Sequence, residues 1–105
     1  MEKIIDVIEK NGRGVYRVEE GDTLESLALK YSTTKEILIR DNNLDGEVIN
    51  GDVLYIRTFK KVYTVGVLDT PYIVAEKLNV TIEKLYDLNG VDYLYPYQRI
   101  IYEDT

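Results

Sequence analysis

The stretch GDTLESLALKY, residues 21–31, decides the fold of this chain. Its apolar residues stand at positions 24, 27, 28 and 31, which is the spacing of a helix with one buried face. Asp22 or Thr23 can cap the first turn, and Asp22 with Glu25 has the spacing of a capping box. Because a strand-like run precedes this helix, the chain must turn sharply on Gly21. That turn is expected to expose several backbone N–H groups to a small polar ligand.

The chain is a tandem duplication of one unit. When it is shifted by 47 positions, residues 15–44 fall on residues 62–91 with eleven identities, whereas chance would give roughly two. The identical pairs are Val15/Val62, Tyr16/Tyr63, Val18/Val65, Asp22/Asp69, Thr23/Thr70, Ala28/Ala75, Lys30/Lys77, Thr34/Thr81, Glu36/Glu83, Leu38/Leu85 and Asn42/Asn89. A one-residue deletion after Asn89 then brings Leu54 over Ile100. A period of this length is typical of small repeated modules.

Two helices are predicted in each unit. In the first unit they cover about residues 23–31 and a second stretch that extends to about residue 41. Thr33 or Thr34 can cap the second helix, and Thr33 with Glu36 has capping-box spacing.

Two strands enclose these helices. Tyr16 and Val18 alternate as the inner face of the first strand, and residues 53–56 form the second. Strands separated by two helices can pair antiparallel, with both helices on one face of the ribbon. The predicted fold class is therefore α+β: two tandem βααβ units, each a two-stranded antiparallel ribbon with two helices on one face, plus a short N-terminal helix.

The predicted domains are an N-terminal segment, two repeats and a linker: residues 1–14, 15–57, 58–61 and 62–105. In the first segment, Ile4, Ile5 and Ile8 fall on one helical stripe and Asn11 with Gly12 forms a C-cap; a short strand is the alternative. The stripe is expected to pack on its own domain or on a second copy, which would make a homo-oligomer.

The short linker predicts that the two units touch. Phe59 either fills that contact or packs under the second strand of its own unit.

Charge and missing residue types exclude several function classes. The net charge is −6 and the thirteen Lys and Arg residues are spread out, so nucleic acid and anionic membrane surfaces are poor partners. The absence of cysteine and histidine removes disulfides, thiol nucleophiles, the usual zinc sites and the commonest general base. A glycosidase needs two carboxylates across a cleft, and units this small offer no deep cleft. We therefore expect no catalytic residue, no metal site, no cofactor and no enzymatic activity.

The sequence leaves the location of the protein open. No segment approaches the ~18 apolar residues of a membrane span. Residues 1–10 carry charges inside their only apolar run, so they lack the core of a secretory signal. The expected locations are the cytoplasm, a spore or phage particle, or the cell wall as a fragment of a longer protein.

Three segments of the first unit together resemble a LysM domain: VYRVEEGDTL at 15–24, NNL at 42–44 and INGDVLYI at 49–56. Residues 62–102 resemble a second, divergent LysM repeat. The resemblance implies non-covalent binding of N-acetylglucosamine-containing glycans, such as peptidoglycan and chitin. In this family the sugar lies in a shallow groove between the loop after strand one and the loop before strand two. Carried onto this sequence, the groove residues are Gly21, Asp22, Thr23, Leu24, Val48, Ile49 and Asn50.

The second repeat departs from the family pattern at its groove. Leu68 stands in place of Gly21, Pro71 in place of Leu24, and YPYQ at 95–98 in place of INGD. The loss of glycine removes the residue most able to adopt the turn, and the proline ring replaces a groove side chain. The second repeat is therefore expected not to be a standard glycan site.

A tyrosine cluster marks this second groove. Tyr93, Tyr95 and Tyr97, with Tyr72 near them, either form a different sugar platform or fill the groove and make a protein contact; we favour the contact. The residues of a candidate second glycan site are Asp69, Thr70, Tyr95 and Tyr97.

Asn42 and Asn89 occupy the near-constant asparagine of the family. They are predicted to brace the loops and not to bind the ligand, because a short amide side chain can hydrogen-bond turn backbone.

Two functions compete. The first is glycan binding, mainly in repeat one. The alternative is a protein-interaction or assembly module of the spore-coat or phage-tail type that uses the LysM fold without sugar. The acidic charge, the altered second groove and the isoleucine stripe motivate it. The expected partner is therefore a glycan containing N-acetylglucosamine or a protein.

Overall fold

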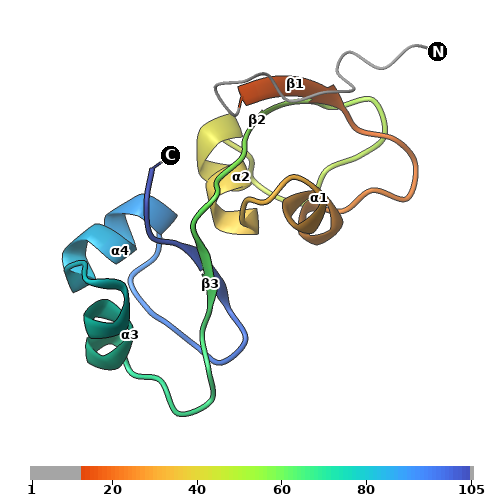
Figure 1. Cartoon of the computed structure of the whole chain (residues 1–105). Coiled ribbons are helices and arrows are strands. Elements are labelled where there is room, and N and C mark those ends of the chain that lie inside the picture. Colours follow the sequence, from red (N-terminus) through yellow and green to blue (C-terminus); the bar gives the residue numbers. More distant parts are fainter. Residues whose placement is uncertain (1–12, 105) are drawn as a thin grey trace.

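The computed structural model describes residues 13–104, and the predicted N-terminal helix with its oligomer contact lies outside them. The elements are β1 (Arg13–Arg17), α1 (Leu24–Lys30), α2 (Lys35–Asn42), β2 (Val53–Arg57), β3 (Val62–Thr64), α3 (Pro71–Leu78), α4 (Ile82–Asn89) and β4 (Arg99–Ile101). In each repeat the helix pair lies on one side of its own strand pair (Figure 1). The predicted α+β class with two tandem βααβ units is confirmed.

Each repeat has its own antiparallel ribbon and its own core. β1 pairs with β2, with Arg13 opposite Arg57, and β3 pairs with β4, with Val62 opposite Ile101. Tyr16 of β1 and Val18, the residue directly after β1, are both buried as predicted, at 0% and 1% exposure. The buried residues of the first core are Tyr16, Val18, Leu24, Leu27, Ala28, Leu38, Val48, Leu54 and Ile56. Those of the second are Val65, Val74, Ala75, Leu85 and Ile100.

The cap of α1 is Thr23. Its hydroxyl accepts the Ser26 N–H at 3.0 Å, and the Ser26 hydroxyl accepts the Thr23 N–H at 2.9 Å. The expected capping box of Asp22 with Glu25 is therefore wrong. The reason is that the Asp22 carboxylate points back to the strand and accepts the Tyr16 hydroxyl at 2.6 Å.

The cap of α2 is Thr34, whose hydroxyl accepts the Ile37 N–H at 3.1 Å. The expected capping box of Thr33 with Glu36 is wrong, because Thr33 belongs to the connection from α1 and donates its N–H to the Ala28 carbonyl at 2.9 Å. The Thr33 hydroxyl is buried and has no hydrogen-bond partner within residues 13–104.

One asparagine in each repeat ties the second helix to the closing strand. The Asn42 side chain donates to the Leu38 and Tyr55 carbonyls at 2.9 and 2.8 Å and accepts the Tyr55 N–H at 2.7 Å. Asn89 makes the same three bonds at 2.7–2.8 Å with the equivalent helix and strand residues, Ile101 among them. Both asparagines thus hydrogen-bond backbone, as predicted, but they brace the second helix against the closing strand and not the loop.

The two repeats are in contact, as the short linker predicted. Phe59 is 6% exposed and packs against Ile37 of α2 and Ile101 of β4. Phe59 therefore fills the contact between the repeats.

Two arginines hold the repeats together. Arg40 of α2 donates from Nη1 and Nη2 to the Asp87 and Leu88 carbonyls at 2.8 and 2.9 Å. These carbonyls lie in the last turn of α4, where backbone carbonyls have no partner within the helix. Arg99 of β4 donates to the Thr33 carbonyl at 2.6 Å. The relative position of the repeats is thus fixed by directed bonds as well as by apolar packing.

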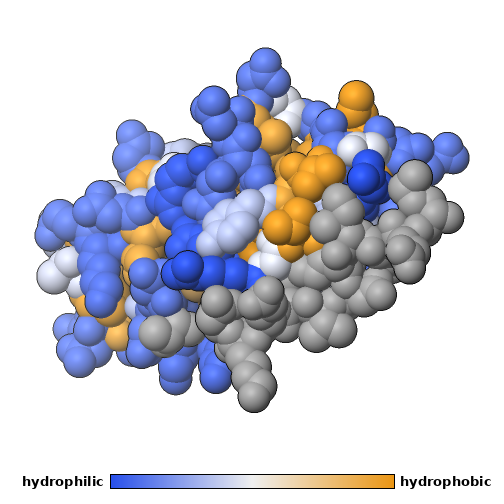
Figure 2. Space-filling view, turned by 90° about the horizontal axis from the view of Figure 1, so that it is seen from above, coloured by the Kyte–Doolittle hydropathy of each residue, from blue (hydrophilic) through white to orange (hydrophobic). Residues whose placement is uncertain are grey.

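The face of the described residues seen in Figure 2 is mostly hydrophilic, with hydrophobic side chains gathered in a few groups. Over the described part of the chain, no helix is long and apolar enough to cross a membrane. The same residues contain no group of three or more His, Cys, Asp or Glu side chains placed to hold a metal ion.

Candidate functional site

Two turns of the first repeat lie side by side at the predicted groove. In the first turn, the Asp22 N–H donates to the Glu19 carbonyl at 3.1 Å, and Gly21 has a φ of +92°. In the second turn, the Asp52 N–H donates to the Ile49 carbonyl at 3.1 Å. The Gly51 N–H joins the two turns by donating to the Val18 carbonyl at 2.9 Å.

The predicted groove residues differ in what they present to solvent. Leu24 and Val48 are buried, at 2% and 6% exposure, and belong to the core. Ile49 is 70% exposed, and Asn50, Gly21 and Thr23 are also exposed. A ligand between the turns would therefore meet Ile49 as its apolar contact, with Leu24 and Val48 beneath the surface.

Glu47 links the two sides of this surface, and the sequence analysis missed it. Its Oε1 accepts the Leu24 N–H at 2.7 Å and the Val48 N–H at 3.0 Å. A carboxylate at a helix N-terminus is stabilised by the unpaired N–H groups there. The only signal in the sequence was an acidic residue directly before Val48.

The N–H groups at the start of α1 already have partners. Those of Asp22, Thr23 and Leu24 donate to the Glu19 carbonyl, the Ser26 hydroxyl and the Glu47 carboxylate. The expectation that this turn offers several free N–H groups is therefore wrong for these three. A ligand acceptor could reach the Leu24 N–H only by displacing Glu47.

Asp22 has a structural role beneath the turn. Its carboxylate accepts the Glu19 N–H at 2.8 Å and the hydroxyl of Tyr16. Burial, together with the Asp22 carboxylate, raises the pKa of Tyr16 above its usual value. The phenol therefore stays protonated and keeps donating to Asp22.

The same arrangement recurs in the second repeat. Asp69 accepts the Tyr63 hydroxyl at 2.6 Å, the Gly66 N–H at 2.7 Å and the Lys77 ammonium at 3.1 Å. The Tyr63 hydroxyl, the Gly66 N–H and Lys77 lower the pKa of Asp69 from 3.8 to about 2. Thr70 caps α3, where its hydroxyl accepts an N–H at 3.2 Å. Thr70 thus caps the helix and Asp69 holds the turn before it, although both are also predicted to belong to the candidate second glycan site.

The substitutions in the second repeat change its two turns differently. Leu68 takes the place of Gly21 without a positive φ, although the turn keeps its i to i+3 hydrogen bond, from Asp69 to Gly66, at 3.1 Å. Tyr97, in contrast, takes the place of Gly51 and keeps a positive φ, at +70°.

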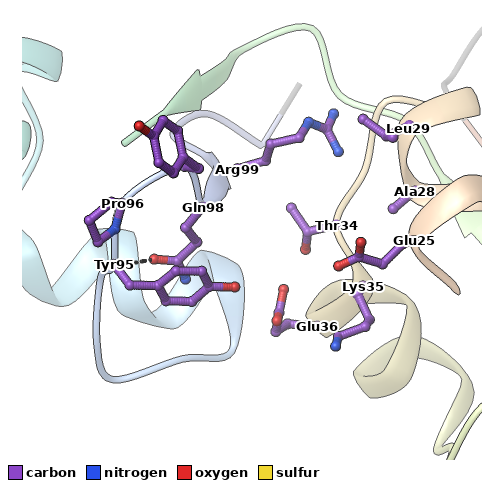
Figure 3. Close-up of a pocket in the computed structure, with 11 residues that line it drawn as sticks. Glu25, Ala28, Leu29, Thr34, Lys35, Glu36, Tyr95, Pro96, Gln98 and Arg99 are labelled. Carbon is purple, nitrogen blue, oxygen red and sulfur yellow. Dashed lines mark hydrogen bonds between the residues drawn. The ribbon is translucent and has the colours of Figure 1, made fainter. Parts of the chain in front are cut away.

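The tyrosines predicted for the second site lie beside the first repeat. Tyr95 and Tyr97 line a pocket of about 240 Å³ between the repeats, together with residues of α1 and α2 (Figure 3). Tyr93 stacks on Tyr95, with 5.6 Å between the ring centroids. Asp69 and Thr70 do not line this pocket, so the structure does not bring the four predicted residues together in it. Sequence reasoning missed the wall from the first repeat, because no local motif marks it.

Comparisons with known proteins point to one family. The chain is 30% identical over 108 residues to N-acetylmuramoyl-L-alanine amidase sle1 of two Staphylococcus epidermidis strains, which covers 86% of this chain and 33% of each relative. The chain thus spans about a third of the length of these curated relatives.

Two similar solved structures are spore cortex-lytic enzymes SleL. The Bacillus cereus enzyme has a TM-score of 0.43 and 26% identity, covering 88% of this chain and 23% of that one. The Bacillus megaterium QM B1551 enzyme has a TM-score of 0.42 and 28% identity, and the match covers 87% of this chain and 22% of that one.

The family model of the LysM domain matches residues 16–56 and 63–101. These two segments make up most of the chain and coincide with the two βααβ repeats. LysM domains are in general non-catalytic modules that bind peptidoglycan and other N-acetylglucosamine-containing glycans. This chain belongs to the LysM family, with two repeats in tandem.

Proposed function

We propose that this chain binds glycans containing N-acetylglucosamine, of the peptidoglycan or chitin type, without acting on them, and mainly through its first repeat. The observation that carries the proposal is the pair of adjacent turns that leaves Ile49 and Asn50 exposed. The LysM family and the name of the matched relatives, N-acetylmuramoyl-L-alanine amidase, support the same ligand class.

The two turns leave room for close approach. A Cβ atom built on Gly21 or on Gly51 would meet no atom within 4 Å, so open space lies in front of both glycines. Their positive φ angles, +92° and +99°, suit glycine and strain any other residue. Glycine therefore allows a turn at which a ligand can approach the backbone.

The chemistry of the exposed groups matches an N-acetyl sugar. The methyl of the acetyl group can pack on the Ile49 side chain, and the acetamide can hydrogen-bond the Asn50 amide and nearby peptide groups. Binding needs no ionised group in this arrangement. Because few groups contribute, a single site should be weak, with a Kd of roughly 1 mM.

Titration with chitin oligosaccharides and peptidoglycan fragments tests the proposal. Amide NMR signals at residues 21–24 and 48–50 should shift with added glycan. Ile49→Asp should weaken binding at least about tenfold, because it places a charge in the apolar contact. Leu68→Asp is the matched control, since Leu68 is an exposed apolar residue in the equivalent first turn of repeat two.

Three outcomes are decisive. Shifts at these residues that disappear in Ile49→Asp and persist in Leu68→Asp support the proposal. Unchanged signals at millimolar glycan overturn it in favour of a protein-assembly role. Binding lost only in Leu68→Asp overturns the assignment to repeat one.

A further inference from the structure

The pocket between the repeats has an aromatic wall from the second repeat and a charged wall from the first. One wall is the loop before β4, with Tyr95, Pro96 and Tyr97, and the other consists of α1 and the start of α2 (Figure 3). Its volume of about 240 Å³ is below the roughly 300–1,000 Å³ typical of pockets for drug-sized ligands. It therefore suits a group no larger than a single ring.

The wall from the second repeat is aromatic and exposed. Tyr95 and Tyr97 are 44% and 75% exposed, and Tyr93 stacks on Tyr95. The Gln98 side chain accepts the Tyr95 N–H at 2.9 Å and fixes the turn. Tyrosine combines a flat apolar ring with a polar tip, as a surface for a sugar requires.

Tyr97 has a strained backbone, and the packing of its side chain does not offset that strain. Its φ of +70° lies in the left-handed region, which is unfavourable for any residue with a Cβ. At 75% exposure its ring adds little to the core. Strained residues of this kind gather at binding sites.

The two walls together carry balanced charge. Glu25 and Glu36 contribute carboxylates, while Lys35 and, across the pocket, Arg99 contribute cations. Within residues 13–104 none of these four side chains takes part in an ion pair. Burial and the carboxylates of Glu36 and Glu25 raise the pKa of Tyr95, in line with their common pocket. Donors and acceptors are therefore available to a neutral polar ligand.

The pocket is held in place before any ligand arrives. Arg99 donates to the Thr33 carbonyl at 2.6 Å across the contact, and Phe59 packs against both repeats beside it. A preformed site loses less free energy to ordering when it binds.

We propose that the pocket between the repeats binds one sugar ring of the same glycan, so that a longer chain occupies the first-repeat site and this pocket together. The inference rests on the proposed function. Glu25, which lines the pocket, lies in the first turn of α1, and the exposed N-cap of the same helix, Thr23, belongs to the first-repeat site, so both sites include the start of α1. A neutral ring matches the tyrosine faces and walls that carry two carboxylates and two cations, whereas an anionic peptide would also have to approach a protein with a net charge of −6.

Titration with N-acetylglucosamine oligomers of increasing length tests the pocket. The wild-type protein should bind long oligomers more tightly than short ones, because two adjoining sites act on one chain. Tyr95→Ala and Tyr97→Gly should weaken the binding of long oligomers roughly threefold to tenfold and leave short ones unchanged. Tyr72→Ala is the matched control, because Tyr72 is 79% exposed and lies outside the pocket.

The outcomes separate the two proposals. If the wild type binds but the pocket variants match it at every length, the pocket inference is overturned and the proposed function stands. If the wild type binds no glycan, both fail. If the Tyr95 and Tyr97 ring signals move only with fragments that carry a peptide, a peptide site replaces the sugar site. Glu36→Gln serves as a second variant, and thermal unfolding confirms that each variant is folded.

Discussion

Gly51 and Tyr97 occupy the same corner of their repeats with the same left-handed backbone, at φ +99° and +70°. Each is the third residue of a turn closed by a backbone hydrogen bond, at 3.1 Å in repeat one and 3.2 Å in repeat two. Pro96 precedes Tyr97, and proline is favoured at the second position of such a turn. The duplication thus kept the turn and replaced a permissive residue by an aromatic one.

The turn in the first repeat should depend on its glycine. Gly51→Ala is expected to lower the free energy of unfolding by about 1–2 kcal/mol, because alanine is strained at this φ. Gly46→Ala is the control, since a Cβ there also meets open space but without a positive φ. Urea denaturation measures both. Equal effects of the two changes would show that backbone strain is not the cause.

The sequence predicted the repeat architecture well, because its signals are local. Helical spacing at residues 24, 27, 28 and 31 and the identities between the repeats needed no tertiary information. The helix caps were harder to place. Asp22 and Thr23 are both good caps by residue type. Thr23 is the cap because the Asp22 carboxylate accepts a hydrogen bond from the Tyr16 hydroxyl instead.

The candidate sites were less predictable because they depend on contacts between distant residues. Glu47 reaches the Leu24 N–H across 23 residues, and no motif marks that bond. The pocket depends on how the two repeats pack against each other. One hydrogen bond that fixes this packing joins Arg99 to the Thr33 carbonyl, 66 residues apart in the sequence. Sequence periodicity contains no information on such docking.

The two bracing asparagines should differ in importance. Asn89 is 2% exposed, whereas Asn42 is only partly buried, although both make three hydrogen bonds. Asn89→Ala leaves the Ile101 N–H and carbonyl unpaired inside the protein and should cost about 2–3 kcal/mol; Asn42→Ala should cost less. Thermal unfolding of both variants measures the difference. A larger loss for Asn42→Ala would show that burial does not set the cost.

Arg40 should couple the two repeats. Arg40→Ala removes the two bonds to the Asp87 and Leu88 carbonyls and is expected to cost about 1 kcal/mol, since the side chain is partly exposed. The repeats should also tumble more independently, as measured by NMR relaxation. Lys84→Ala, on the exposed side of α4, is the control. If both variants tumble as the wild type does, Phe59 and Arg99 are enough to hold the contact.

The Asp69 network should make the second repeat sensitive to pH. The pKa of Asp69 is lowered from 3.8 to about 2 in the fold. The ionised carboxylate therefore stabilises the fold at any pH above the pKa of the unfolded state, and this stabilisation is lost as the pH falls through about 2. Asp69→Asn should therefore lower Tm near pH 7, and the difference from wild type should shrink between about pH 4 and pH 2. At the alkaline end, Asp69 raises the pKa of Lys77, so the contribution of Lys77 is lost only as the pH rises through that raised value. Asp45→Asn, in an exposed loop, is the control, and a Tm difference independent of pH would contradict the assignment.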